Sequence, residues 1–263
     1  MTENSVEIIG LCKSFVRPEQ GSIAICKNLN LKLKKGKIYS IIGTSGSGKT
    51  TLINMIAGFE NYDSGAVVLD GGNKAYKVGI LFQDSVLYPW KTIMDNMLFA
   101  CKNDFENPKE LVRAFLRKAG LEEVENCYPN ELSGGMQQRI ALLRVLLTKP
   151  DLVILDEAFG ALDFQIRNQM QELFLELHSE QKFTAIVVTH DLTEAIRLGD
   201  EVLAFYGRPL EYEVLNSNIT SEEDKENLLE KINKIYSYRK EYIYEKRVLQ
   251  NSSRVGVWRE SRI

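Results

Sequence analysis

Residues 37–59, KIYSIIGTSGSGKTTLINMIAGF, decide the fold of this chain. The stretch begins with a short apolar run typical of a buried strand, passes through a glycine loop, and continues with apolar residues at helical spacing as far as Gly58. Residues 43–50, GTSGSGKT, fit the pattern GxxxxGK[ST] in the strand–loop–helix context that this pattern requires. Such a loop binds phosphates through its backbone N–H groups, and the positive end of the following helix favours the same anions.

The glycine loop supplies the first candidate ligands for a nucleoside triphosphate and its magnesium ion. We expect Lys49 to reach the β- and γ-phosphates and the Thr50 hydroxyl to bind Mg²⁺. A glycine turn without function is the alternative, and the Lys-Thr pair together with the strand–helix context weighs against it. The residues expected to bind the nucleotide here are Gly43, Thr44, Ser45, Gly46, Ser47, Gly48, Lys49, Thr50 and Thr51.

Adjacent carboxylates follow a second apolar run, LVILD at residues 152–156. Asp156 would hold Mg²⁺ through water, and Glu157 would polarise a water molecule for attack on the γ-phosphate. Two neighbouring carboxylates repel each other unless a cation lies beside them. The pattern alone is also typical of a strand that runs into a polar loop. Beside the glycine loop, it indicates a nucleoside triphosphatase.

Residues 130–144, NELSGGMQQRIALLR, contain a second set of backbone amides suited to anions. Ser133 is a suitable N-cap, and its hydroxyl together with the amides of Gly134 and Gly135 would form an anion-binding helix N-terminus. Glycine weakens a helix, and nothing nearby in the sequence requires either glycine. A serine N-cap with incidental glycines is the alternative, and these three residues do not decide between the two.

Strand and helix patterns alternate along the chain, which predicts an α/β domain with a largely parallel sheet. The segment from residue 85 to residue 149 is predicted to be all-helical, with one helix framed by Asn107, Pro108 and Gly120. Further helical spacing covers 163–179 and, from Ser221, much of the tail. The remaining predicted strands are 6–11, 23–33, 66–70, 78–83 and 184–190.

The composition is that of an ordinary globular protein, with 263 residues, 44% apolar and 26% charged. A net charge of −3 offers no electrostatic case for nucleic acid as a partner. The cysteines form no CxxC pair, and we expect them to be reduced thiols in the cytosol. The first ten residues do not resemble a signal peptide, and no run of 18 apolar residues predicts a membrane span.

The chain resembles the ATP-binding subunits of ABC transporters in six stretches that follow one another in the family's order. These are the glycine loop, Gln83 at the end of VGILFQ, the signature LSGGMQQR, LVILDE, GALD at 160–163 and His190 in VVTHD. The resemblance implies an α/β fold: a P-loop NTPase (RecA-like) core with an N-terminal antiparallel β subdomain and an inserted α-helical subdomain at about 85–149. It implies an ATPase domain over 1–215 and a helical tail over 216–263.

The resemblance also implies how the two anion sites cooperate. In this family two ATPase subunits face each other head to tail, so ATP on one glycine loop is covered by the LSGG helix end of the other chain. Asp163 would then lie across the dimer seam near the opposite site.

Further roles follow from matching positions. Gln83 would contact Mg²⁺ and the attacking water, Glu157 would be the general base, and His190 would hydrogen-bond the γ-phosphate. Phe15, in LCKSF, aligns with the aromatic residue that stacks on adenine, although a buried strand-end phenylalanine would look the same. His178, the second histidine, is expected at the surface.

Two stretches are similar to the nitrate, sulfonate and taurine importer ATPases: DSVLYPWKTIMDNM after Gln83, and AFGALD after Glu157. Ala158 replaces the usual proline, and Tyr88 replaces leucine. This branch implies a peripheral ATPase on the cytoplasmic face of the membrane that forms a homodimer, binds integral membrane permease subunits, and works indirectly with a periplasmic or lipid-anchored solute-binding protein. Trp90 would either meet the permease or pack beneath the helical insertion.

Other functions stay open on the sequence alone. A soluble ABC ATPase of translation or DNA repair would usually carry two cassettes or a long coiled coil, and this chain shows neither. An exporter subunit, or a subunit for another small solute, also fits the motifs. The tail helix, with Leu228, Ile232 and Ile235 as a partial apolar stripe, is expected to be a surface helix with a frayed end, or else to contact the membrane subunit or lipid.

Overall fold

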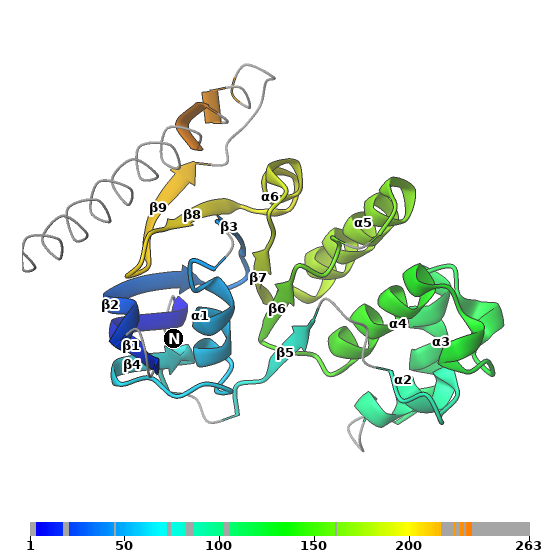
Figure 1. The fold of residues 1–263 in the computed structure, drawn as a ribbon. Coiled ribbons are helices and arrows are strands. Elements are labelled where there is room, and N and C mark those ends of the chain that lie inside the picture. Colours follow the sequence, from blue (N-terminus) through cyan, green and yellow to red (C-terminus); the bar gives the residue numbers. More distant parts are fainter. Residues whose placement is uncertain are drawn as a thin grey trace, which may run out of the picture.

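The computed structural model describes residues 4–17, 21–44, 46–72, 75–82, 87–101, 106–160 and 162–216, together with 224, 227, 228 and 230–232. Figure 1 shows its elements. The strands are β1 (Asn4–Arg17), β2 (Gly21–Lys34), β3 (Ile38–Gly43), β4 (Ser64–Leu69), β5 (Val78–Leu81), β6 (Leu152–Asp156), β7 (Thr184–Val188), β8 (Glu201–Tyr206) and β9 (Glu211–Asn216). The α-helices are α1 (Lys49–Ile56), α2 (Ile93–Cys101), α3 (Pro108–Lys118), α4 (Gly134–Leu147), α5 (Phe164–Gln181) and α6 (Leu192–Leu198).

A six-stranded sheet in the order β5-β6-β7-β3-β8-β9 forms the centre of the fold. The first five strands of this order run parallel, and β9 pairs antiparallel with β8. The expected α/β architecture with a largely parallel sheet is therefore confirmed. Because parallel strands end at one edge, the glycine loop after β3 and the carboxylates after β6 meet at the same edge of the sheet.

The sheet is buried on both faces because its side chains alternate between two apolar clusters. One face packs against α1 and the N-terminal strands β1 and β2 through residues such as Tyr39, Ile41 and Ile154. The other face packs against the helices through Val153 and Leu155. This double cover explains why β6 and β7 read as continuous apolar runs rather than as alternating ones.

The N-terminal strands form a separate three-stranded antiparallel sheet, in the order β2-β1-β4. Strands β1 and β2 are longer than the sequence patterns predicted, and register shifts interrupt their pairing between Ile8 and Ser14. The inner face of this sheet covers α1 with side chains that include Leu31 and Leu33. The expected antiparallel β subdomain is present.

Helices α2, α3 and α4 lie together at one end of the molecule, on the opposite side from the N-terminal sheet (Figure 1). Pro108 opens α3, and Gly120, with φ of +64°, follows its end, as the sequence predicted. Asn107 occupies the N-cap position without a side-chain cap bond. The exact limits of an inserted subdomain and of the tail stay a proposal.

His178 differs from its expected place at the surface. Its ring packs against Phe174 and Phe183, with centroids 6.4 Å and 5.0 Å away, and its buried Nε2 has no hydrogen-bond partner within the described part of the chain. Burial lowers the pKa of this imidazole. The prediction was wrong because the polar residues beside His178 in the sequence lie on another face of α5, while His178 is covered by Phe183 from the following loop.

Two apolar residues of the tail contact the core. Leu228 and Ile232 are buried in a cluster with Ile42 and with residues of α6 and β8. Two of the three residues of the predicted apolar stripe therefore pack against the core, while Ile235 lies outside the described residues. None of the helices in the described part of the chain has the length and apolar character needed to span a bilayer.

Candidate functional site

The glycine loop lies between β3 and α1, and the packing of its neighbours explains two of its glycines. A Cβ on Gly43 would lie 2.5 Å from the carbonyl oxygen of Phe205 on β8. Gly48 has φ of +114°, and a Cβ there would lie 2.7 Å from the side chain of Ile25 on β2. Side chains at either position would push the loop away from the two sheets that hold it.

Lys49 is buried at the start of α1, and its ammonium group is held inside the loop. Its Nζ donates to the carbonyl oxygens of Gly43 at 2.9 Å and Thr44 at 3.1 Å. Burial lowers the pKa of Lys49, while the nearby carboxylates Glu157 and Asp156 favour its charged form. An incoming phosphate would offer this partly desolvated cation a further anionic partner.

The other loop residues differ in exposure. The Oγ of Ser47 is buried and, among the described residues, has no hydrogen-bond partner. Thr50 is exposed and Thr51 is partly buried in the first turn of α1. Ser45 lies outside the described residues.

Asp156 and Glu157 lie at the end of β6, at the same sheet edge as the glycine loop. Burial first, and the charge of Glu157 second, raise the pKa of Asp156, and Lys49 opposes the shift. Glu157 leaves the strand with φ of +50°, a conformation that non-glycine residues rarely adopt. Its N–H donates to the carbonyl oxygen of Val188 at 2.9 Å, which fixes this turn against β7. Such local strain is common at functional sites.

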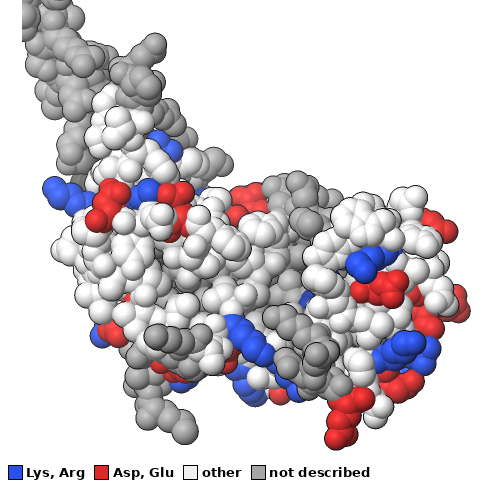
Figure 2. All heavy atoms as spheres, turned by 90° about the horizontal axis from the view of Figure 1, so that it is seen from below, with Lys and Arg blue, Asp and Glu red and all other residues white. Residues whose placement is uncertain are grey.

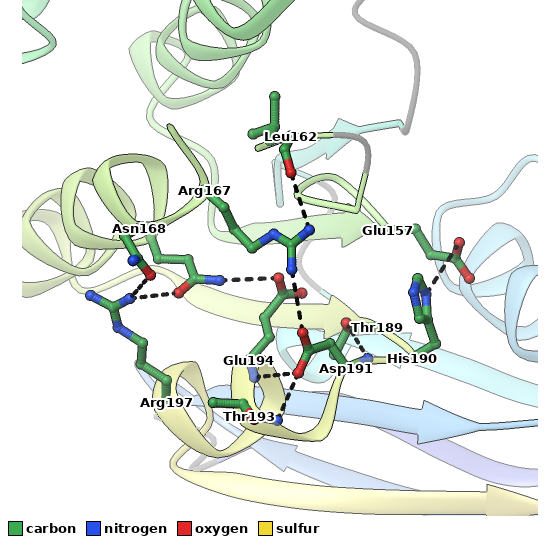
Figure 3. A network of polar contacts seen from close by, with 11 residues as sticks. Glu157, Leu162, Arg167, Asn168, Thr189, His190, Asp191, Thr193, Glu194 and Arg197 are labelled. Carbon is green, nitrogen blue, oxygen red and sulfur yellow. Dashed lines mark hydrogen bonds and ion pairs between the residues drawn. The ribbon is translucent and has the colours of Figure 1, made fainter. Parts of the chain in front are cut away.

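His190 faces Glu157 from the end of β7 (Figure 3). Its Nδ1 lies 3.8 Å from Oε2 of Glu157, too far for a hydrogen bond, and the imidazole is 69% exposed. The backbone around it is firmly held, because the N–H of Thr189 donates to the carbonyl oxygen of Ile41 at 3.0 Å. The two side chains are therefore close enough for one ligand to contact both.

A network of polar contacts begins at Asp191, the residue that follows His190 (Figure 3). Asp191 caps α6 by accepting from the backbone N–H groups of Thr193 at 2.8 Å and Glu194 at 3.2 Å. The Nη1 of Arg167 lies 3.4 Å from Oδ2 of Asp191, and its Nη2 donates to the carbonyl oxygen of Leu162 at 3.1 Å. The network joins the segment that carries Asp163 to the segment that carries His190.

Ser133 caps α4 as predicted, because its Oγ accepts from the N–H of Met136 at 3.3 Å. Gly134 is exposed, and a Cβ there would meet no atom within 4 Å. Gly135 is buried, and its Cβ would lie 2.8 Å from Ile166 of α5. The expectation that no neighbour requires either glycine is therefore wrong for Gly135, because its neighbour comes from a distant part of the chain.

The signature segment lies apart from the glycine loop of the same chain. Figure 1 places α4 among α2 and α3, and α1 beside the N-terminal sheet. Asp163 caps α5 by accepting from the N–H of Ile166 at 3.0 Å, and it is exposed next to Phe164, which is also exposed. These exposed groups are free to meet a second molecule.

Phe15 is exposed near the end of β1 rather than buried, which excludes the alternative of a core phenylalanine. The ammonium group of Lys13 lies 4.7 Å from its ring centroid and forms an ion pair with Glu60 at 2.5 Å. Lys13 thus lies over one face of the Phe15 ring. Gln83, the other predicted residue of this region, lies outside the described residues.

Trp90 is 71% exposed, so the alternative that it packs beneath the helices is wrong. It lies against Tyr88, with ring centroids 5.7 Å apart, and Tyr88 contacts Phe99 at 5.2 Å. The guanidinium of Arg144 lies 5.5 Å from the Tyr88 ring. A supported and exposed aromatic cluster of this kind is typical of a contact with another protein.

Two side chains that the sequence analysis did not select also touch the site. Gln138 is buried and donates to the carbonyl oxygen of Ala158 at 2.9 Å, which ties the signature helix to the loop after Glu157. Arg208 donates to the carbonyl oxygen of Gly46 in the glycine loop. The signal for Arg208 was its place in a tight turn, GRP, after an apolar strand, but only the sheet order shows which loop it reaches.

Acidic and basic side chains are interspersed over the face of the molecule seen in Figure 2. On the described residues, no group of three or more His, Cys, Asp or Glu side chains is arranged to hold a metal ion.

Comparisons with known proteins agree with this geometry. The family model described as ABC transporter matches residues 26–160. An aliphatic sulfonates import ATP-binding protein SsuB of Bacillus thuringiensis subsp. konkukian is 35% identical over 84% of this chain and 89% of its own. An SsuB 2 protein of Agrobacterium fabrum is 39% identical over 76% of this chain and 75% of its own. A dimeric ATP-binding cassette, solved in a post-hydrolysis state with ADP and Pi, is 29% identical with a TM-score of 0.66, and the match covers 79% of this chain and 98% of the other.

Proposed function

The chain belongs to the ABC transporter family, and we propose that it is the ATP-hydrolysing subunit of an importer for a small anionic solute of the sulfonate class. The observation that carries the proposal is the meeting of Lys49, Asp156, Glu157 and His190 at one edge of the sheet, beside a glycine loop with an orphaned hydroxyl.

The proposed chemistry is phosphoryl transfer from ATP to water, which yields ADP and phosphate. The loop amides, Ser47 and Lys49 bind and orient the phosphates. Glu157 accepts a proton from the attacking water, and His190 donates a hydrogen bond to the γ-phosphate. Phe15 stacks on the adenine. Catalysis then consists of positioning and charge stabilisation, without a covalent intermediate on the protein.

The residues present fit a magnesium ion at this place. Thr50, Gln83 and Asp156 would hold it together with phosphate oxygens, because Mg²⁺ binds few protein carboxylates and retains water. The half-buried Asp156, whose pKa is raised beside Glu157, is stabilised in its charged form by a cation. When bound, the ion would neutralise charge on the phosphates.

We further propose that the nucleotide is shared between two copies of this chain. Ser133, Gly134 and Gly135 at the start of α4 would cover the ATP on the partner's glycine loop, and Asp163 would lie at the seam. Support comes from the separation of α4 from α1 in Figure 1 and from the exposure of the first turn of α4. A dimeric cassette is among the similar solved structures.

The remaining partners follow from the proposed transport role. The cluster of Tyr88, Trp90 and Phe99, in which Trp90 and Phe99 are exposed, suits an integral membrane permease, which would place the chain at the cytoplasmic face of the membrane. A periplasmic or lipid-anchored solute-binding protein would act indirectly through that permease. Two curated relatives carry the name of aliphatic sulfonate importers, which supports the choice of solute class.

Glu157→Gln tests the proposal. The variant keeps the shape and hydrogen-bonding capacity of the side chain but cannot accept the proton, so hydrolysis should fall by a factor of about 100 or more. With ATP and magnesium it should form a stable dimer, seen by size-exclusion chromatography with light scattering. Hydrolysis at the native rate in this variant would contradict the assigned base.

A matched carboxylate away from the site provides the control. Glu172 on α5 is exposed and ion-paired with Arg197 at 3.0 Å. Glu172→Gln should leave hydrolysis and dimer formation unchanged. Transport of a sulfonate by vesicles that contain the chain with its permease would then test the solute class separately from the ATPase activity.

A further inference from the structure

We propose that Arg208 is a positioning residue for ATP binding, which acts by holding the glycine loop in its phosphate-receiving form. The inference rests on the proposed function and extends it to a residue outside the motifs. Arg208 lies in the turn between β8 and β9, and its Nε donates to the carbonyl oxygen of Gly46 at 2.6 Å. Nη2 of the same guanidinium also donates to this oxygen.

The turn that carries Arg208 is anchored on both sides. Tyr206 before it and Leu210 after it are buried. The N–H of Leu210 donates to the carbonyl oxygen of Ile25 at 2.6 Å, and Ile25 is the residue that packs against Gly48. The arginine therefore extends from a fixed base, which limits the entropy lost when its side chain is ordered.

The contact holds one peptide group of the loop at both polar ends. Arg208 binds the carbonyl oxygen of Gly46, and the N–H of Ser47 in the same peptide group donates to the carbonyl oxygen of Thr44 at 3.2 Å. Gly46 has φ of +74°, and a Cβ there would lie 3.0 Å from the arginine. The orientation of this peptide group decides where the following amides point, and an ordered loop binds phosphate without a further loss of entropy.

Arg208 and Lys49 hold the loop in different ways. Lys49 is buried, and its ammonium donates to the carbonyl oxygens of Gly43 and Thr44, which leaves its third N–H for a phosphate. Arg208 is exposed and contacts Gly46 alone among the loop carbonyls for which a bond is described. Its bond can persist when a nucleotide enters, which suits a support of the loop rather than a competitor of the ligand.

The shape of guanidinium explains the choice of residue. Two of its N–H groups converge on one oxygen, a fork that the single ammonium group of lysine cannot reproduce. Replacement by lysine keeps the charge and loses the fork. Replacement by glutamine loses both. Comparing the native chain with the lysine variant therefore reports on the paired hydrogen bonds, and comparing the lysine with the glutamine variant reports on the charge.

The experiment measures ATP binding and turnover in Arg208→Gln and Arg208→Lys. For the full chain with magnesium, Arg208→Gln should raise the Kd and KM for ATP about three- to tenfold, as expected for loss of a charged hydrogen bond at an exposed site. The kcat should stay within about twofold of native, because the groups that act on the transferring phosphate are unchanged. Arg208→Lys should lie between native and Arg208→Gln, and millimolar guanidinium chloride should restore part of the affinity of Arg208→Ala.

Arg113 provides the control, since it pairs with Glu110 and Glu125 on the helical side of the molecule. Arg113→Gln should leave the KM for ATP unchanged. Unchanged ATP affinity in folded Arg208→Gln would overturn the inference. A fall in kcat and in stability with no change in KM would also overturn it. If Arg208→Gln does not fold, native affinity in Arg208→Lys would overturn it. A native chain that neither binds nor hydrolyses ATP would instead contradict the proposed function.

Discussion

Replacing Gly134 by alanine separates the structure of one chain from the demands of a shared site. Gly134 is the first residue of α4, it is exposed, and a Cβ there would meet no atom within 4 Å. Alanine favours a helix over glycine by about 0.5–1 kcal/mol, so the variant should be at least as stable as the native chain. For a chain of this size a gain of 1 kcal/mol raises Tm by about 2–4 °C.

The same methyl group should damage function. In the proposed dimer the peptide of Gly134 approaches the triphosphate bound to the other chain, and an added methyl group in a close contact costs about 1–3 kcal/mol. ATP-driven dimerisation in the Glu157→Gln background and ATP hydrolysis in the native background should both fall about tenfold or more. Light scattering and phosphate release measure the two quantities.

Gly135→Ala is the contrasting variant, because its Cβ would lie 2.8 Å from a side-chain carbon of Ile166. It should lose about 1–3 kcal/mol of stability by overpacking. Trimming the neighbour in Gly135→Ala/Ile166→Ala should relieve the clash. Native hydrolysis in Gly134→Ala, or a loss of its stability, would refute the assignment of this glycine to a contact between chains.

Two further predictions concern buried ionisable groups. Burial lowers the pKa of His178, so the unfolded chain takes up its proton first as pH falls below about 6.5, and the native chain should lose stability there. In His178→Phe, the free energy of unfolding measured in urea should change less with pH between pH 7.5 and about pH 5.5 than in the native chain. Burial raises the pKa of Glu194, so the stability it contributes is present below the ordinary pKa of about 4.3 and is lost as pH rises through the folded-state pKa. Glu194→Gln, which keeps an acceptor for Gln171, should therefore equal or exceed the native denaturation midpoint at pH 8, and a clear decrease would count against this reasoning.

The parts of the fold that the sequence predicted well are those with local causes. The glycine loop between β3 and α1, the Ser133 cap and the helix opened by Pro108 depend on residues within a few positions of one another. Strands β6 and β7 were evident because both of their faces are buried and their apolar runs are unbroken.

The features that the sequence did not predict depend on contacts between distant segments. No element was assigned to residues 191–216, where α6, β8 and β9 form. The apolar residues of α6 and β9 are interrupted by polar ones, whereas β8 holds an unbroken apolar run that the sequence analysis did not use. Gly135 gains its packing role from Ile166, His178 is covered by Phe183, and Arg208 reaches Gly46 across 162 positions. Pattern alone does not show which side chains meet in these ways.

Mixing two defective variants tests the shared nucleotide site most directly. One variant, Lys49→Ala, loses the phosphate-binding cation but keeps its signature helix, and the other, Ser133→Arg, keeps Lys49 but blocks the helix end. Both carry Glu157→Gln, so that bound ATP is retained. If each site combines Lys49 of one chain with Ser133 of its partner, neither variant alone forms an ATP-bound dimer with magnesium, whereas the equimolar mixture forms dimers that retain one ATP each. A mixture that forms no more ATP-bound dimer than Ser133→Arg forms alone would contradict the account.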